Sequence, residues 1–334
     1  MKLYRAARSL VVLGVAFASL SAILIRISDA PPVVIAFYRM LFTSAMLTPL
    51  FAASRRPRHS RRRAAISERN AKVTTHHSSP TREGSRPHRQ DSVMRDAGGR
   101  PLTRRDVFLL VASGAFLAIH FASWNASLSY TTVASSVVLV TLHPMFVALG
   151  SVAFLGERVP GKAFGYISLA IVGSALLSYG DFALGPEALL GNMLAVIGAI
   201  AVAGYMLIGR FLRRSIEAKV YNITVYSVAA VILFAIAIAR GDALSPYPLH
   251  EFLIFAALAF FCTILGHSIF NWALKYVSAS SVSTSILLEP IFASLMALFL
   301  FAEVPGPMAI GGGAIVVVSL YMVLQAERTQ EQRK

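Results

Sequence analysis

The chain has 334 residues, of which 56% are hydrophobic and only 14% are charged, and its net charge is +15. Soluble domains carry about 25% charged residues, so this composition excludes an ordinary soluble protein. The single cysteine, Cys262, excludes a disulfide framework and a cysteine-based metal site. The apolar residues form blocks of about 18 to 24 residues, long enough for a helix to cross the hydrocarbon layer. The sequence therefore predicts an all-α integral membrane protein.

Taken in chain order, the apolar blocks predict ten transmembrane helices. They are expected at residues 6–27, 33–53, 106–127, 131–155, 161–179, 187–208, 219–239, 250–274, 278–302 and 305–325. Gly and Pro clusters, such as those at 159–161 and 304–307, separate neighbouring helices. The first block follows basic residues, as in a signal peptide, but its apolar part is longer than that of a signal peptide. We therefore expect it to stay in the protein as the first membrane helix.

The distribution of Lys and Arg predicts the orientation of these helices. If the N-terminus is cytoplasmic, all 31 Lys and Arg residues except Arg26, Arg39 and Arg240 fall in cytoplasmic segments. An excess of positive charge in cytoplasmic loops is the usual pattern in membrane proteins. We expect a multi-pass protein of the cell membrane with cytoplasmic N- and C-termini.

The segment 54–105 is the only long polar stretch between the apolar blocks. It is rich in Lys, Arg, Ser, Pro and His and has no apolar periodicity, which predicts a disordered cytoplasmic loop. It is either a tolerated basic insertion or an anchor for anionic lipid head groups. Nucleic-acid binding is not expected, because no folded reader and no aromatic platform accompany the charge.

The two halves of the chain are related by an internal repeat. A constant spacing without gaps pairs Asn125 with Asn271, Pro144 with Pro290, and Glu157 with Glu303. A second constant spacing aligns the first helix with the sixth and pairs Arg26 with Arg210.

The repeat divides the chain into residues 6–179, which the basic loop interrupts, and residues 187–325. Each half then holds five helices, and an odd number places the second half in the membrane in the opposite sense. Inverted repeats with interrupted helices at matching positions are typical of secondary transporters.

Two stretches carry a resemblance to a known family. They are HPMFVALGSVAFLGERVPGKAFGYISLAIVGSALL at 143–177 and EPIFASLMALFLFAEVPGPMAIGGGAIVVVSLYMV at 289–323. Their mid-helix proline, closing acid, short Pro/Gly turn and Gly-rich final helix resemble the EamA-type repeat of the drug/metabolite transporter superfamily. The resemblance implies a ten-helix transporter with a central cavity between the repeats, in a family that carries amino acids, nucleotide sugars, drugs and other metabolites.

The most unusual polar residue is Glu289, which precedes Pro290 inside an apolar run. A charge at the bilayer centre costs about 3 kcal/mol, so such a residue normally faces the interior of the helix bundle or water. Proline lacks the backbone N–H and disturbs the preceding turn, which frees carbonyl groups for polar partners. Glu289 is therefore a candidate site for a proton, an amine or a cation, or else a neutral residue at a structural kink.

The repeat gives Glu289 a counterpart in His143, which precedes Pro144. A neutral histidine gives or takes a proton or binds a polar group, although it also serves as an interior residue bonded to nearby backbone. Arg39, inside the second helix, offers a bidentate fork for a carboxylate or phosphate. Its alternative role is to pair with an acid across the bundle or to extend towards the membrane surface.

A further set of polar and aromatic candidates lies on the third and eighth helices. His120 and Trp124 are four residues apart and share one helix face, whereas Asn125 points in another direction. His267 and Asn271 share a face in the same way and are candidates for a polar cavity wall. For Trp124 the favoured alternative is a place in the aromatic belt at a membrane interface. Tyr205 and Trp272 are additional candidates.

These features favour a secondary transporter that works by alternating access on a small metabolite, and export is common among the relatives that the resemblance implies. An acid and an arginine in one cavity would suit a zwitterion such as an amino acid. No cofactor and no metal site are expected, and the absence of a P-loop lysine pattern argues against an ATP-driven pump. The alternative is a membrane-embedded enzyme such as a lipid-modifying transferase, but the sequence has no HExxH motif and no close acid pair. A channel is disfavoured because intramembrane polar residues are few.

Overall fold

The computed structural model describes residues 2–54, 102–155, 160–181, 185–273, 275–276, 286 and 288–332. All regular elements in these residues are helices, and no strand forms among them. The prediction of an all-α protein is therefore confirmed for this part of the chain. The basic loop falls almost wholly outside it, since α2 ends at Ser54 and the next described helix begins at Arg104.

The helices follow the apolar blocks closely. In the first half they are α1 (Lys2–Arg26), α2 (Pro32–Ser54), α4 (Arg104–Ser127), α5 (Val133–Val140), α6 (His143–Leu155) and α7 (Gly161–Asp181). In the second half they are α8 (Pro186–Leu212), α9 (Ala218–Arg240), α10 (Leu249–Ala257), the π-helix η2 (Leu258–His267), α11 (Ser268–Ala273), α13 (Glu289–Phe301) and α14 (Pro307–Gln332). Most of the first part of the helix expected at 278–302 lies outside the described residues.

The helix expected at 131–155 is two helices, because the chain leaves helical geometry at Thr141 and Leu142. In a continuous helix the carbonyl of Val140 would accept a bond from residue 144, but Pro144 has no N–H. The ring nitrogen Nδ1 of His143 lies 3.2 Å from this carbonyl and replaces the missing donor. The break therefore has a local covalent cause and a local hydrogen bond that compensates for it.

The helix expected at 250–274 is likewise three segments, with a π-helix between two α-helices. A π-helix has one more residue in each hydrogen-bonded turn, and such segments occur frequently at functional sites. Here the π-helical stretch ends at His267, directly before the segment that carries Asn271.

Six stretches of the described helices are long and apolar enough to cross a membrane. They are Pro32–Pro49, Arg104–Ser127, Val133–Phe154, Pro186–Leu212, Ala218–Arg240 and Leu249–Ala273. Shorter apolar helices cover Leu13–Arg26, Gly161–Leu177, Glu289–Phe301 and Pro307–Val323. The chain is therefore a multi-pass membrane protein.

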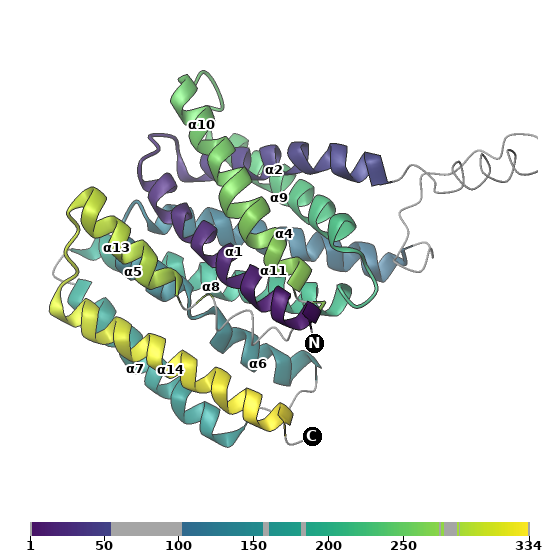
Figure 1. Cartoon of the computed structure of the whole chain (residues 1–334). Helices are drawn as coiled ribbons and strands as arrows, with labels where there is room; N and C mark the ends of the chain where they lie inside the picture. The colour runs from purple at the N-terminus through teal and green to yellow at the C-terminus, as the bar shows by residue number, and fades with distance from the viewer. Residues whose placement is uncertain are drawn as a thin grey trace, which may run out of the picture.

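The helices of the two halves are interleaved rather than separate. α4 packs along α8, α1 packs along η2, and α2 packs along α9. The last helices of the halves, α7 and α14, form a long pair at one side of the bundle (Figure 1). Figure 1 also shows that α1 begins and α14 ends at the same end of the bundle.

An ion pair joins three elements at the other end of α1. The guanidinium of Arg26 lies 3.3 Å from Glu303, which follows α13, and Arg26 also donates to the carbonyl of Leu128. The second carboxylate oxygen of Glu303 accepts the backbone N–H of Val133, the first residue of α5, at 3.0 Å. One acid thus fixes the start of α5 and the end of α1 to each other.

The pair α7–α14 depends on close approach of the two backbones at glycine. A Cβ atom on Gly312 would lie 2.6 Å from the carbonyl oxygen of Gly173 and 2.6 Å from the backbone nitrogen of Leu177. Small residues at helix contacts are a principal source of packing energy inside membranes.

We expect Gly312→Ala to destabilise the protein by about 2 kcal/mol, because the new methyl group meets backbone rather than a movable side chain. The adjacent Gly311 has open space around its Cβ position, so Gly311→Ala is the matched control and should be nearly neutral. Thermal unfolding of the two purified variants in detergent measures the difference. Equal melting temperatures for both variants would contradict the tight contact.

Candidate functional site

A cavity lies inside the bundle and is lined by helices of both halves. Its wall is formed by α4, the junction of α5 and α6, α8, η2, α11 and the start of α13, and its volume is about 50 Å³. The lining residues are His120, Trp124, Val140, Thr141, His143, Val202, Tyr205, Met206, His267, Phe270, Asn271, Ile286 and Glu289. Apolar and polar groups therefore share one wall, as is typical of sites for small molecules.

The cavity brings together most of the polar residues that the sequence singled out. His120 and Trp124 come from α4, His143 from the start of α6, His267 from the end of η2, and Asn271 and Glu289 from α11 and α13.

The side chains of α4 form a stacked pair on one wall. The rings of His120 and Trp124 have centroids 5.8 Å apart and are nearly parallel, as their four-residue spacing on one helix face predicts. The Nδ1 atom of His120 lies 3.0 Å from the carbonyl of Gly198 on α8, which fixes the ring orientation. The ring of His267 lies 6.4 Å from that of His120, so the two histidines are neighbours across the cavity.

His143 and Glu289 occupy equivalent positions, because each is the first residue of its helix. His143 is buried, and its Nε2 atom has no hydrogen-bond partner, although Nδ1 is bonded to Val140. Glu289 is half-buried, and its side chain contributes to the cavity wall beside the buried Pro290. The first turn of a helix carries free N–H groups, which favour negative charge there.

Asn271 is the centre of a buried polar network that sequence reasoning only partly identified. Its Nδ2 atom lies 2.6 Å from the Tyr205 hydroxyl, 2.8 Å from Oδ1 of Asn222 and 3.2 Å from the Tyr226 hydroxyl. Asn222 and Tyr226 were not predicted as partners. Their spacing of four residues on α9 is the one signal in the sequence that could have indicated them.

Two predicted residues do not line the cavity. Arg39 is fully buried, with Nε bonded to Thr263 at 2.7 Å and Nη1 bonded to Ser21 at 2.7 Å. Its guanidinium lies 4.2 Å from the ring centroid of Phe121. Asn125 points away from the cavity and donates to the carbonyl of Pro32 at 3.2 Å, which ties α4 to the start of α2. In this structure Glu289 lines the cavity and Arg39 does not, so the two residues do not share one cavity.

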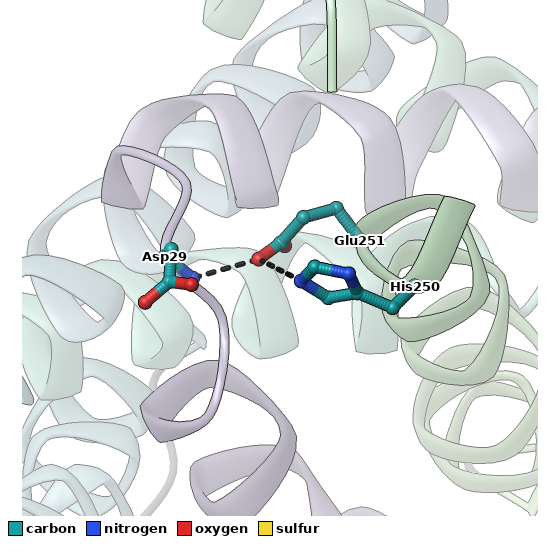
Figure 2. A group of neighbouring side chains, drawn as sticks. All are labelled: Asp29, His250 and Glu251. Atoms are coloured by element: carbon teal, nitrogen blue, oxygen red, sulfur yellow. Dashed lines mark hydrogen bonds and ion pairs between the residues drawn. The ribbon is translucent and has the colours of Figure 1, made fainter. Parts of the chain in front are cut away.

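A second group of ionisable residues, Asp29, His250 and Glu251, lies where α10 meets the turn between α1 and α2 (Figure 2). Glu251 is buried and accepts bonds from the backbone N–H of Asp29 at 2.8 Å and from the Ser28 hydroxyl at 2.5 Å. His250 lies 3.5 Å from the same carboxylate. Both oxygens of Glu251 are thus engaged with protein donors, so its evident role is to hold the turn.

Comparison with known proteins decides the family. The sequence profile of the EamA-like transporter family matches residues 94–179 and again residues 189–325. The chain belongs to this family. The resemblance inferred from the two Pro-containing repeats is therefore confirmed, and the protein is a membrane transporter rather than an enzyme.

Several relatives of this EamA protein are named as transporters. The pseudopaline exporter of Pseudomonas aeruginosa is 27% identical over 68% of this chain and 78% of its own length. The probable terminal-alkyne amino-acid exporter of Streptantibioticus cattleyicolor is 23% identical over 68% and 76%, respectively. A solved crystal structure with 16% identity matches the fold with a TM-score of 0.60 and covers 96% of this chain and 97% of its own.

We expect Asn271→Leu to destabilise this EamA protein by about 1 to 2 kcal/mol, because it removes the central donor from buried hydroxyl and amide oxygens. The matched variant is Asn125→Leu, which loses a single hydrogen bond and should cost less. The melting temperatures of both variants in detergent measure the effect. A larger loss at Asn125 would contradict the assignment of Asn271 as the centre of the network.

Proposed function

We propose that this EamA protein is a secondary transporter that exports a small metabolite, an amino acid or a related compound, across the cell membrane by alternating access. The observation that carries the proposal is the cavity, whose polar wall includes His143 and Glu289 at equivalent helix starts in the two halves. A carrier of this type needs a site that both halves build, because movement of one half against the other then exposes it to each side in turn.

Helix packing supports ten membrane helices arranged as two inverted repeats, 6–179 and 187–325. The contact of α4 with α8 has its counterpart in the contact of η2 with α1, as a two-fold relation between the halves requires. The pairs α2–α9 and α7–α14 each join equivalent helices of the two halves. The family profile also matches the chain twice, once in each half.

The proposed orientation follows from charge and from the ends of the chain. The start of α1 and the end of α14 lie at one end of the bundle (Figure 1), which agrees with an even number of crossings. The basic residues favour the cytoplasm for this end. Export and an amino-acid-like cargo draw support from the relatives named as exporters of pseudopaline and of a terminal-alkyne amino acid.

The proposal is tested by flux. The purified protein is reconstituted into proteoliposomes, and radiolabelled amino acids and related metabolites are followed under an imposed pH gradient. Transport of at least one compound above protein-free vesicles is expected. The proposal is contradicted if a compound binds the protein tightly but no tested compound crosses the membrane.

We further propose that Glu289 couples transport to protons. It is a cavity-lining acid inside the bundle, and ionisable residues at such positions are energetically costly and mark proton or substrate pathways. Glu289→Gln should abolish proton-driven transport, because the amide cannot take up and release a proton. The melting temperature should remain close to that of the unaltered protein. The matched control is Glu187→Gln at an exposed position in the first turn of α8, which should transport normally.

A further inference from the structure

We propose that Asp29, His250 and Glu251 form a zinc site that joins the two halves of the chain at one end of the bundle. Asp29 lies in the turn between α1 and α2, in the first half, whereas His250 and Glu251 lie in the first turn of α10, in the second half. Figure 2 shows that the three side chains face one another. The site lies at the end of the bundle opposite the chain termini (Figure 1), and none of its residues lines the central cavity.

The spacing of the ligand atoms fits a metal ion. One such atom from each residue lies within 4.8 Å of the other two. Nε2 of His250 is 3.5 Å from Oε1 of Glu251, which is longer than a good N–H···O hydrogen bond. Two donors that each lie about 2.1 Å from a tetrahedral zinc ion stand about 3.4 Å apart. The pair is therefore spaced like two ligands of one ion, and the exposed Asp29 side chain needs only a small rotation to supply the third.

The group has an excess of negative charge. The two carboxylates lie close enough to repel each other, and Glu251 is only 1% exposed, so water screens it poorly. Within the described part of the chain, no Lys or Arg forms an ion pair with Asp29 or Glu251. Neutral imidazole is the form of histidine that binds metals, and it adds no positive charge. A divalent cation compensates both carboxylates and takes His250 as its nitrogen ligand.

The hydrogen bonds of Glu251 orient it as a ligand. Oε1 accepts the backbone N–H of Asp29, and Oε2 accepts the hydroxyl of Ser28. Each oxygen of a carboxylate has two lone pairs, so these bonds leave capacity for an ion. Carboxylates that bind metals are themselves usually held by hydrogen bonds of this kind. Asp29 and His250 are exposed, so an ion reaches the group directly from water.

The donor set selects zinc among the common divalent ions. One imidazole nitrogen and two carboxylate oxygens suit Zn²⁺, whereas Mg²⁺ and Ca²⁺ prefer oxygen ligands alone. Because the ligands come from both halves of the chain, bound zinc holds the turn between α1 and α2 against α10. If the halves move against each other during alternating access, zinc slows transport. This consequence rests on the proposed function, whereas the binding of zinc does not.

Zinc binding is measured by isothermal titration calorimetry on the full chain in detergent, at neutral pH and without chelators. The basic segment 54–105 holds four further histidines, which could bind zinc themselves, so a background variant replaces each of them by Gln. They are His59, His76, His77 and His88. In this background we expect one Zn²⁺ to bind per chain and to raise the melting temperature, because a ligand of the folded state stabilises it. Mg²⁺ and Ca²⁺ at the same concentration should do neither.

Variants in this background assign the ligands. His250→Gln and Asp29→Asn alter exposed residues, so both proteins should fold and melt like the background when zinc is absent. Each should bind zinc about ten-fold or more weakly, because even the loss of an outer partner of a metal ligand costs about 10- to 100-fold in affinity. The matched control is Glu187→Gln, which removes an exposed acid outside the group and should bind zinc like the background.

The outcomes separate the zinc site from the proposed function. No zinc binding in the background variant, or equal zinc affinity of the His250→Gln and Glu187→Gln variants, overturns the site. In the flux assay, with zinc on both sides of the membrane, slower transport by the background but not by the His250→Gln variant supports the restraint of the halves. Transport that zinc does not slow overturns that restraint alone. If no compound is transported at all, the transporter proposal fails, and calorimetry still decides the zinc site.

Discussion

The absent N–H of Pro144 is the constraint on which the architecture of the cavity depends. Backbone groups inside a membrane must find partners within the protein, because no water is present to replace a missing bond. The carbonyl of Val140 loses its helical donor to the proline and gains His143 in its place. The exchange ends α5, starts α6 and fixes the imidazole ring, whose second nitrogen, Nε2, is buried without a partner.

The remainder of the bundle holds this break in position. Glu303 pairs with Arg26 and accepts the N–H of Val133, which links the first turn of α5, the short helix before the break, to the end of α1. The π-helix η2 ends at His267, whose ring lies 6.4 Å from that of His120. At one side of the bundle, α7 and α14 pack so closely at Gly173 and Gly312 that neither position has room for a methyl group.

The buried polar groups bond to neighbouring parts of the bundle, and several of them still keep one unpaired atom. Arg39, Asn125 and Asn271 are bonded to neighbouring helices, and their hydrogen bonds fix how those helices pack. Nη2 of Arg39 and Oδ1 of Asn125 have no partner, and neither do Nε2 of His143 and Nε1 of Trp124, two residues that line the cavity.

The sequence by itself determined the membrane class, the family and most helix limits, because the length of an apolar block and the chemistry of Gly and Pro act locally. It also singled out Glu289 and His143, because a polar residue before a proline is conspicuous in an apolar run. Only the tertiary structure decided that Arg39 bonds to the hydroxyl groups of Ser21 and Thr263. It likewise decided that Asn271 bonds to Asn222 and Tyr226. Which neighbour a side chain meets depends on the rotation of each helix about its axis. That rotation is set by packing across the whole bundle and, at η2, by a π-helical turn that the residue pattern does not encode.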